Sequence, residues 1–448
     1  MYTYQDLLEV LDNDEARMSF VQGVIHSHKN SDAYCQAKIA DEYVKHRNVT
    51  ITNYQKLLYT ISGEVVPDNY SANYKLCSNF FDRFVTQENQ YLLGNGISLD
   101  KDNEKTKLGE DFDIRLQELG RYALTHGVGF GFWNLDHMEV FSFLEFAPLY
   151  DEEDGALKAG IRFWQIDKSK PLRATLYELD GYTEYIWRDG KGEVLSDKRK
   201  YVLKVRETPA DGQWVYDGEN YPSFPIVPLW GNPERQSEIV GRREQIDAYD
   251  LIKSGFASDL DDASQIYWTI SNAGGMDDID LVKFLKHMKT VKAAVIDEDG
   301  ANAESHTIDV PYASREALLD RIRSDLYEDF MALDTKNIAG GAATATQIKA
   351  AYEPLNNKTD MYEYCLHDFL KNIFALAGVD AEASFTRSVI VNTQDEVTTL
   401  IQGAAYLDGD YVTQKILELM GDGDKAEEML KEMDENTMQR IGGIEEGE

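Results

Sequence analysis

The chain has 448 residues, of which 45 are Lys or Arg and 80 are Asp or Glu, so its formal net charge is −35. Its hydrophobic share of 43% is enough to build a core and too high for a disordered acidic chain. The negative charge argues against a protein that wraps tightly around DNA, because such binding neutralises phosphates with Lys and Arg, but it permits a protein past which DNA slides.

The N-terminal part of the chain predicts mainly helices. Apolar residues recur at helical spacing in 4–11 and 33–46. A stronger helix is predicted over 74–93, where a broad apolar face ends at a Gly-Asn-Gly stop. A further helix is predicted from 112 to 125.

From 127 to 229 the sequence predicts an antiparallel sheet. Gly127, Gly129 and Gly131 alternate with large apolar residues, which predicts a strand whose backbone lies close to a neighbouring element. The segments that follow are rich in aromatic and β-branched residues and are separated by Asp-Gly turn signals. The predicted strands are 141–146, 161–165, 174–178, 182–187 and 201–205. Four prolines between 222 and 233 then predict a stiff connection.

The middle of the chain predicts two long helices with a small module between them. The helices are predicted over 235–263 and 314–333, because apolar residues repeat there at helical spacing. Within the module, the predicted elements are strands at 265–270 and 293–296 and a small helix at 281–288.

The C-terminal part begins with a break of small residues at 338–343. A helix is then predicted from 346 to 377, with a kink at Pro354. A strand is predicted over 382–391, and two or three short acidic helices over 394–440.

Several stretches of this sequence resemble segments of portal proteins, the head-to-tail connectors of tailed bacteriophages, in their siphophage-type subclass. The stretches are NQYLLGNG (89–96), LGEDFDIRL (108–116), LTHGVGF (124–130) and, most strongly, 228–262 with its IDAYD core. The order of the predicted segments supports the resemblance, which covers most of the chain. It implies an α+β portal fold that forms rings.

The resemblance also implies a division of the chain into parts. These are a wing (1–235 and 378–392), two stem helices (236–263 and 313–335), a small α/β clip (264–312), a tunnel loop (336–346), a kinked helix (347–377) and a helical crown (393–448).

The function implied by the resemblance is a channel at one capsid vertex, formed by twelve copies, through which double-stranded viral DNA is packaged and ejected. The implied partners are the terminase large subunit, the head-completion adaptor and tail proteins, and the major capsid and scaffolding proteins, since the family nucleates capsid assembly. The implied location is the portal vertex of the virion, with the host cytoplasm during assembly.

The glycine-rich break has the chemistry of a loop that faces DNA. A negative channel repels phosphates, while sparse cations and neutral donors give weak, replaceable contacts. The candidate residues are Lys336, Asn337, Gly340, Gly341, Thr344, Thr346 and Lys349. The alternative is a flexible linker between two helices, and the resemblance favours the tunnel loop.

Two further groups of charged residues are candidate contact sites. The clip carries a basic cluster, Lys283, Lys286, His287, Lys289 and Lys292. It fits a face for a partner, a solvated helix face, or a face that forms ion pairs with Asp277, Asp278 and Asp280 of the next subunit. The long helices carry Arg242, Arg243, Glu244, Arg321, Arg323 and Asp325, which fit either ion pairs between subunits or surface solubility.

Signals for catalysis, metals and cofactors are weak, so we predict a protein that is not an enzyme and holds no metal or cofactor. His26 and His28 lack the partners of a zinc motif and are predicted to be a surface pair. The acidic run at 152–154 is predicted to be a loop. The glycines at 127–131 lack the Lys and Ser/Thr of a phosphate-binding loop.

Targeting and redox signals are equally sparse. The cysteines Cys35, Cys77 and Cys365 are far apart, which indicates a reduced, intracellular setting. No apolar stretch approaches the roughly 18 residues of a membrane span, and no signal peptide is visible.

Two functions of other classes remain as alternatives. An acidic, β-rich hydrolase or carbohydrate-binding protein would use the lobe at 127–230 and would need convergent carboxylates or an aromatic face in a concave pocket. A helical scaffold would need heptads sustained beyond three repeats, which the long helices lack.

Overall fold

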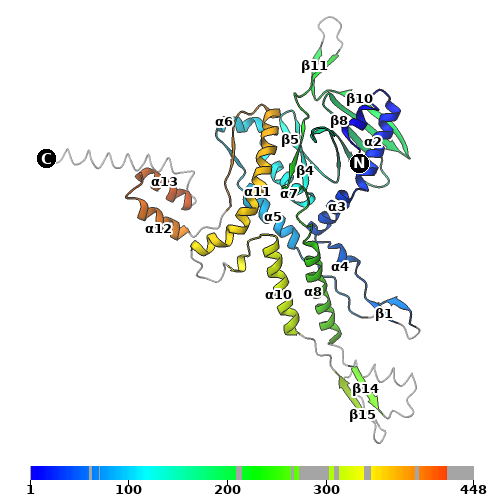
Figure 1. Ribbon diagram of the computed structural model, residues 1–448, viewed down its shortest axis with the longest axis vertical. Helices are drawn as coiled ribbons and strands as arrows, with labels where there is room; N and C mark the ends of the chain where they lie inside the picture. The colour runs from blue at the N-terminus through cyan, green and yellow to red at the C-terminus, as the bar shows by residue number, and fades with distance from the viewer. Residues whose placement is uncertain are drawn as a thin grey trace, which may run out of the picture.

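The protein is described by a computed structural model, which covers residues 2–59, 63–69, 71–207, 214–263, 267–271, 302–306, 312–337, 345–388 and 393–420. A mixed α+β body carries two long helices, α8 (Arg243–Ala263) and α10 (Tyr312–Asp329), which project from it side by side (Figure 1). Beyond their far ends lies a two-stranded sheet of β14 (Tyr267–Ser271) and β15 (Asn302–His306).

The N-terminus forms four helices: α1 (Tyr4–Leu8), α2 (Asp14–Lys29), α3 (Asp32–Val44) and α4 (Val49–Asn53). Polar residues begin the first three, because a side-chain oxygen there accepts hydrogen bonds from backbone N–H groups that lack helical partners. Thr3, Asn13 and Ser31 are these caps. The helices predicted at 4–11 and 33–46 are confirmed, with shorter bounds.

A five-stranded antiparallel sheet follows, in the order β10-β9-β8-β7-β6. Its strands are β6 (Phe146–Tyr150), β7 (Leu157–Trp164), β8 (Leu172–Glu178), β9 (Gly181–Arg188) and β10 (Lys191–Arg199). Buried side chains from one face pack against α1 and α2. The predicted antiparallel sheet is therefore confirmed, and its aromatic residues are largely core.

A second sheet has the order β13-β4-β5, with β4 (Val128–Asn134) between β5 (His137–Ser142) and β13 (Ile226–Trp230). The close approach predicted for its glycines is confirmed: a Cβ on Gly131 would lie 2.7 Å from the ring of Phe369.

One predicted strand was wrong in this region, and one strand lies where a connection was predicted. The segment at 141–146 is split by a turn between β5 and β6. The proline-rich connection contains β13, where Pro228 is tolerated because β13 is the edge of its sheet and one side of its backbone needs no partner.

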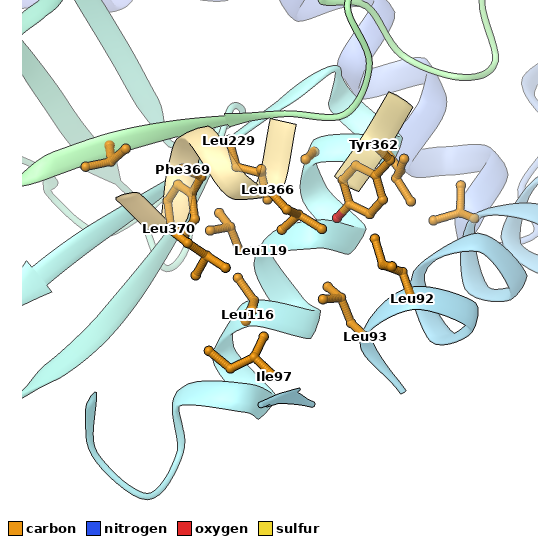
Figure 2. Packing of buried hydrophobic residues seen from close by; sticks show 14 of the residues in the cluster. Leu92, Leu93, Ile97, Leu116, Leu119, Leu229, Tyr362, Leu366, Phe369 and Leu370 are labelled. Atoms are coloured by element: carbon orange, nitrogen blue, oxygen red, sulfur yellow. The ribbon is translucent and has the colours of Figure 1, made fainter. Parts of the chain in front are cut away.

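The main core forms where α5 (Phe80–Leu93), α7 (Phe112–His126) and α11 (Ala345–Ala377) meet. Figure 2 shows the contact. Tyr362, Leu366, Phe369 and Leu370 of α11 point toward Leu116 and Leu119 of α7, Leu92 and Leu93 of α5, Ile97 and Leu229. The long helix predicted from 346 is confirmed, with Pro354 inside it, and Figure 1 shows it changing direction along its length.

Two helices begin later than predicted. The helix predicted over 74–93 starts at Phe80, because the residues before it lie extended along α8, where Ser254 and Ser258 accept hydrogen bonds from the backbone of Leu76 and Tyr74. The helix predicted from 235 starts at Arg243, after a run of turns that ends near Gly241, whose φ is +77°.

The remaining described elements are short. They are β1 (Leu57–Tyr59), β2 (Val65–Pro67), β3 (Ile97–Leu99), α6 (Asp102–Lys105), η1 (Thr106–Leu108), β11 (Val202–Glu207), β12 (Trp214–Glu219), η2 (Thr335–Asn337), β16 (Ala383–Phe385), α12 (Thr393–Gly403) and α13 (Gly409–Met420). The strand predicted over 382–391 is described only as β16, which pairs with β3.

Several other predictions fall partly or wholly outside the described residues. These are the clip elements at 281–288 and 293–296, the small-residue break at 338–343, and the chain after Met420. The strand predicted at 265–270 corresponds to β14. Among the helices that the structure describes, none is both long and apolar enough to cross a membrane.

Candidate functional site

Four elements converge at the base of the long helices. They are α5, the turns at 231–242 that precede α8, the end of α10, and α11. A cavity of about 490 Å³ lies between them. We call this place the joint, because the two long helices, the kinked helix and the body meet there.

A buried lysine forms the centre of the joint. Lys358, on α11, places its Nζ atom 2.5 Å from Oε2 of Glu88 on α5 and 3.0 Å from Oε2 of Glu238 in the turns before α8. The side chains of the two glutamates are at most 6% exposed. A charge in such a place is tolerable only when it is paired, so these contacts hold α11 against the body.

Arg242 and Asn232 extend this cluster to α10. Arg242 binds Oε2 of Glu238 at 3.1 Å and donates from Nε to the carbonyl of Asp329, the last residue of α10, at 2.9 Å. The amide of Asn232 donates to the other oxygen of Glu238 at 2.8 Å. Movement of either long helix relative to α11 would therefore disturb hydrogen bonds of one cluster.

The protonation of the cluster follows from its burial. Burial raises the pKa of Glu88 to about 7, although the charge of Lys358 opposes this. Burial acts in the same direction on Glu238, but Lys358 and Arg242 outweigh it and lower the pKa of that carboxyl. Burial favours the neutral form of Lys358, and the two carboxylates outweigh it, so its pKa is raised.

A second ion pair ties α10 to the chain that leads into the predicted tunnel loop. Arg323 donates from both terminal nitrogens to the two carboxylate oxygens of Asp334, each at 2.8 Å. The hydrogen bonds to Arg323 lower the pKa of Asp334. Asp334 also accepts a hydrogen bond from the backbone of Lys336 at 3.1 Å. This pair fixes where the loop leaves α10.

The predicted tunnel-loop residues flank a segment that lies outside the described residues. Lys336 is exposed in η2, and Thr346 and Lys349 are exposed in the first turns of α11. Gly340, Gly341 and Thr344, and the side chain of Asn337, are not among the described parts. Their contact with DNA stays a prediction.

The predicted clip cluster also lies outside the described residues. This holds for all five of its members: Lys283, Lys286, His287, Lys289 and Lys292. Its role as a partner face is therefore untested and remains a prediction.

Most of the predicted stem charges have partners within the chain. Besides Arg242 and Arg323, Arg243 lies 3.3 Å from Asp247, and Arg321 lies 2.9 Å from Asp325. Glu244 is exposed at the start of α8. These pairs do not decide whether the same charges also contact a neighbouring subunit, and that role stays a prediction.

The histidine pair was predicted wrongly. His28 is buried, and its Nε2 forms a 2.9 Å hydrogen bond with the carbonyl oxygen of Phe143, whereas His26 is exposed. Residues two apart on a helix point in different directions, so the two rings share no face. In the described parts of the chain, no group of His, Cys, Asp and Glu is arranged to hold a metal ion.

The cluster around Lys358 was missed in the sequence, although a signal for it exists. Glu88 stands on the same helical face as the buried residues Phe84, Val85 and Leu92. A charged residue within an apolar stripe is predicted to be buried and therefore to need a partner. The sequence does not say that this partner is Lys358, far along the chain.

Comparison with known proteins gives consistent matches to one family. The sequence model described as "Phage portal protein, SPP1 Gp6-like" matches residues 36–442. The portal protein of Clostridium phage phiCD119 is 25% identical over 360 residues, which cover 73% of this chain and 77% of that protein. The portal protein of Bacillus phage SPP1 is 25% identical over 392 residues, covering 78% of this chain and 74% of that protein.

Solved structures with a similar chain come from gene transfer agent (GTA) particles. A chain in the neck of an empty particle has a TM-score of 0.45 at 12% identity, with 76% of this chain and 90% of that chain covered. A chain in the virion of a native particle has a TM-score of 0.43 at 11% identity, with 84% and 98% covered.

Proposed function

The chain belongs to the family of phage portal proteins of the SPP1 Gp6-like type, and from this premise we propose that twelve copies form a ring at one capsid vertex, through which double-stranded viral DNA enters and leaves. As a member of this family it is a structural, non-enzymatic component of the virion and a head-to-tail connector. The hydrolase, carbohydrate-binding and cellular-scaffold alternatives are therefore set aside.

The observation that carries the proposal is the match of residues 36–442 to the family. The arrangement of elements supports it. Two long helices project from the body, a small sheet lies beyond their far ends, and a bent helix begins beside the base of α10 and runs into the body (Figure 1). These correspond to the stem helices, the clip and the kinked helix that we propose for the ring, with the body as the wing and α12 and α13 as the start of the crown.

The channel wall that we propose is mainly acidic. A chain with a net charge of −35 repels phosphates, which keeps DNA from sticking as it slides. Lys336 and Lys349, exposed on either side of the proposed tunnel loop, supply the few positive charges near the DNA. Their contacts would be weak and replaced as the DNA advances.

We propose that the joint couples the tunnel loop to the stem. The loop is anchored on one side by the Arg323–Asp334 pair and on the other by α11, which Lys358 binds to the body. The partners that load and close the head, the terminase large subunit and the head-completion adaptor, would meet the clip. The scaffolding and major capsid proteins would contact the ring as the shell assembles.

The ring is tested by electron microscopy and native mass spectrometry of the purified protein. We expect closed rings with a central channel, and twelve subunits in rings taken from virions. A protein that stays monomeric or dimeric under all assembly conditions would contradict the proposal.

The tunnel loop is tested by deleting residues 340–343. We expect the deleted protein to form rings as the wild type does, because the joint is intact, and phage carrying it to package or retain less DNA. Normal genome packaging and retention would show that this segment is not the gate.

A further inference from the structure

A second cavity, separate from the joint, lies between the body and the N-terminal helices. It has a volume of about 520 Å³ and is bordered by the turn between α2 and α3 and by residues of β6 and β13. Its aromatic walls include Phe143, Tyr150 and Trp230, and its polar groups include Ser27, His126 and Arg235. A volume of this size and a mainly apolar lining with a few polar groups are typical of a ligand pocket.

His126 is a buried polar side chain without a partner. It is the last residue of α7 and is 7% exposed, and neither of its ring nitrogens has a hydrogen-bond partner among the described residues. Burial lowers its pKa to about 4, so the ring is neutral near pH 7 and offers one N–H donor and one acceptor. Buried polar groups are nearly always satisfied, which indicates that something else completes this one.

Arg235 supplies a positive charge at the same cavity. Arg235 is exposed at the rim of the cavity, and its guanidinium lies 4.7 Å from the centre of the Trp230 ring, a cation–π contact that favours this position. In the described ranges no carboxylate forms an ion pair with it, whereas most arginines of the long helices are paired. Its charge also acts on the hydroxyl of Tyr150, which lines the cavity.

We propose that this cavity binds a carboxylate carried on an apolar or aromatic group. The planar guanidinium of Arg235 matches the two oxygens of a carboxylate, and the N–H of His126 can donate to the same ligand. The aromatic walls take the apolar part. Asp32, exposed at the start of α3, also lines the cavity, and its charge opposes any carboxylate. Only a carboxylate that pairs with Arg235 offsets this repulsion, so the ligand class is a monocarboxylate.

The carboxylate can come from two sources. One is a free small molecule. The other is the side chain of an Asp or Glu of a neighbouring copy, and this source rests on the proposed ring. The chain carries 80 acidic residues, so a neighbour offers many such groups.

The first experiment measures binding of phenylacetate to the full-length protein by isothermal titration calorimetry. Phenylacetamide is the neutral control and phthalate the dicarboxylate control. We expect phenylacetate to bind at least about tenfold more tightly than either control. Phenylacetamide cannot form the charge-assisted hydrogen bond, and Asp32 repels the second carboxylate of phthalate. Equal binding of acid and amide would overturn the proposal.

The variant Arg235→Gln should weaken phenylacetate binding about tenfold or more, and His126→Phe should weaken it less, because it removes a neutral donor. Arg188→Gln is the matched control, since Arg188 is an exposed arginine of β9 and lies away from this cavity. Circular dichroism verifies that each variant is folded. Phenylacetate binding that is unchanged in Arg235→Gln contradicts the assignment.

The second experiment compares the subunit with the assembled ring. If a neighbour's carboxylate fills the cavity, phenylacetate binds the subunit but not the ring, and Arg235→Gln lowers the urea concentration at which the ring dissociates. If the ligand is a free molecule, both forms bind phenylacetate equally. A ring that binds none and is unaffected by Arg235→Gln overturns the proposal. A protein that forms no ring under any assembly condition but binds phenylacetate through Arg235 would contradict only the proposed ring.

Discussion

The core around α11 and the paired helices α8 and α10 are held together in different ways. In the core, Leu366, Phe369 and Leu370 are almost wholly buried among side chains of α5, α7 and the strands (Figure 2). In α10 the buried residues are Leu326 and Tyr327, both near its base. Further along, the helices touch through a few partly exposed contacts, such as the Arg315–Asp259 pair and the neighbouring rings of Phe256 and Tyr312.

The two regions therefore obtain their stability from different sources. Apolar burial stabilises the body without help from other molecules, since it supplies most of the free energy of folding. Most of α10 buries little and stays exposed, whereas α8 is partly covered by α4 and by the segment before α5, so the orientation of α10 depends on the joint and on α8. In the proposed ring, that exposed surface is what neighbouring subunits cover.

The largest expected effect comes from breaking the joint. Replacing Lys358 with Met leaves Glu88 buried without a cation and Glu238 with Arg242 alone, which is expected to cost about 3–5 kcal/mol of unfolding free energy. Urea unfolding followed by circular dichroism measures it. The control is Lys349→Met on the exposed start of the same helix, where a change within about 0.5 kcal/mol is expected.

If both lysine variants lose stability equally, the buried cluster is not what fixes α11. The buried Lys358 would then contribute no more to stability than an exposed lysine, and the joint would not be what orients the paired helices.

The next effect is a dependence on pH that belongs to the body. Glu88 has a pKa of about 7 in the folded chain against a usual 4.5, because it is buried. Between these two pKa values, Glu88 is ionised in the unfolded chain and protonated in the folded chain. The stability that the buried, protonated Glu88 contributes is therefore fully present below about pH 4.5 and is lost as the pH rises to about 7. The loss is at most about 3 kcal/mol.

Glu88→Gln should remove this dependence. The measurement is the difference in unfolding free energy between the wild type and the variant, taken at steps from pH 4.5 to 7.5. We expect the wild type to lose stability relative to the variant across that window. A constant difference would show that Lys358 keeps Glu88 ionised throughout.

A pair of identical substitutions compares the two regions directly. In Gly131→Ala the new Cβ would lie 2.7 Å from the ring of Phe369, and overpacking of this kind costs about 1–3 kcal/mol. In Gly255→Ala, inside α8, no atom outside the adjoining helix backbone and the two chain neighbours lies within 4 Å of the new Cβ, and alanine stabilises a helix interior by about 0.5–1 kcal/mol relative to glycine. Thermal unfolding of both variants should show opposite signs; equal signs would mean that the two regions are packed alike.

Elements with a complete local pattern could be predicted from the sequence. The helix α7 and the strands β7, β8 and β9 carry their apolar spacing and turn residues within themselves. The strand β10 does not, because it is mostly polar and forms through backbone hydrogen bonds to β9. The start of α5 was predicted too early, since the residues before Phe80 have helical spacing but obtain their hydrogen bonds from α8.

The same limit applies to the joint. The exposed charges of the long helices could be named as candidates because a charged helix face is visible in one segment. Glu88 and Lys358 come from distant helices, and only packing of α5 against α11 brings them together. Likewise, nothing local predicts that the ring nitrogens of His126 find no hydrogen-bond partner among the described residues.

The smallest expected effect is the loss of an exposed charge of α10, compared with the loss of one that binds both oxygens of its partner. Arg321 is 74% exposed and pairs with Asp325 one turn away, so Arg321→Gln should cost the subunit only about 0.3–0.5 kcal/mol. Arg323 binds both oxygens of Asp334 within the chain, so Arg323→Gln should cost about 1–3 kcal/mol with little dependence on salt. If Arg321 also reaches a neighbouring subunit, its loss should lower the salt concentration at which rings dissociate, because exposed ion pairs are screened. Rings of Arg321→Gln that withstand salt as the wild type does would assign this charge to solubility, and the contact between neighbours would then depend on other residues of the exposed surface.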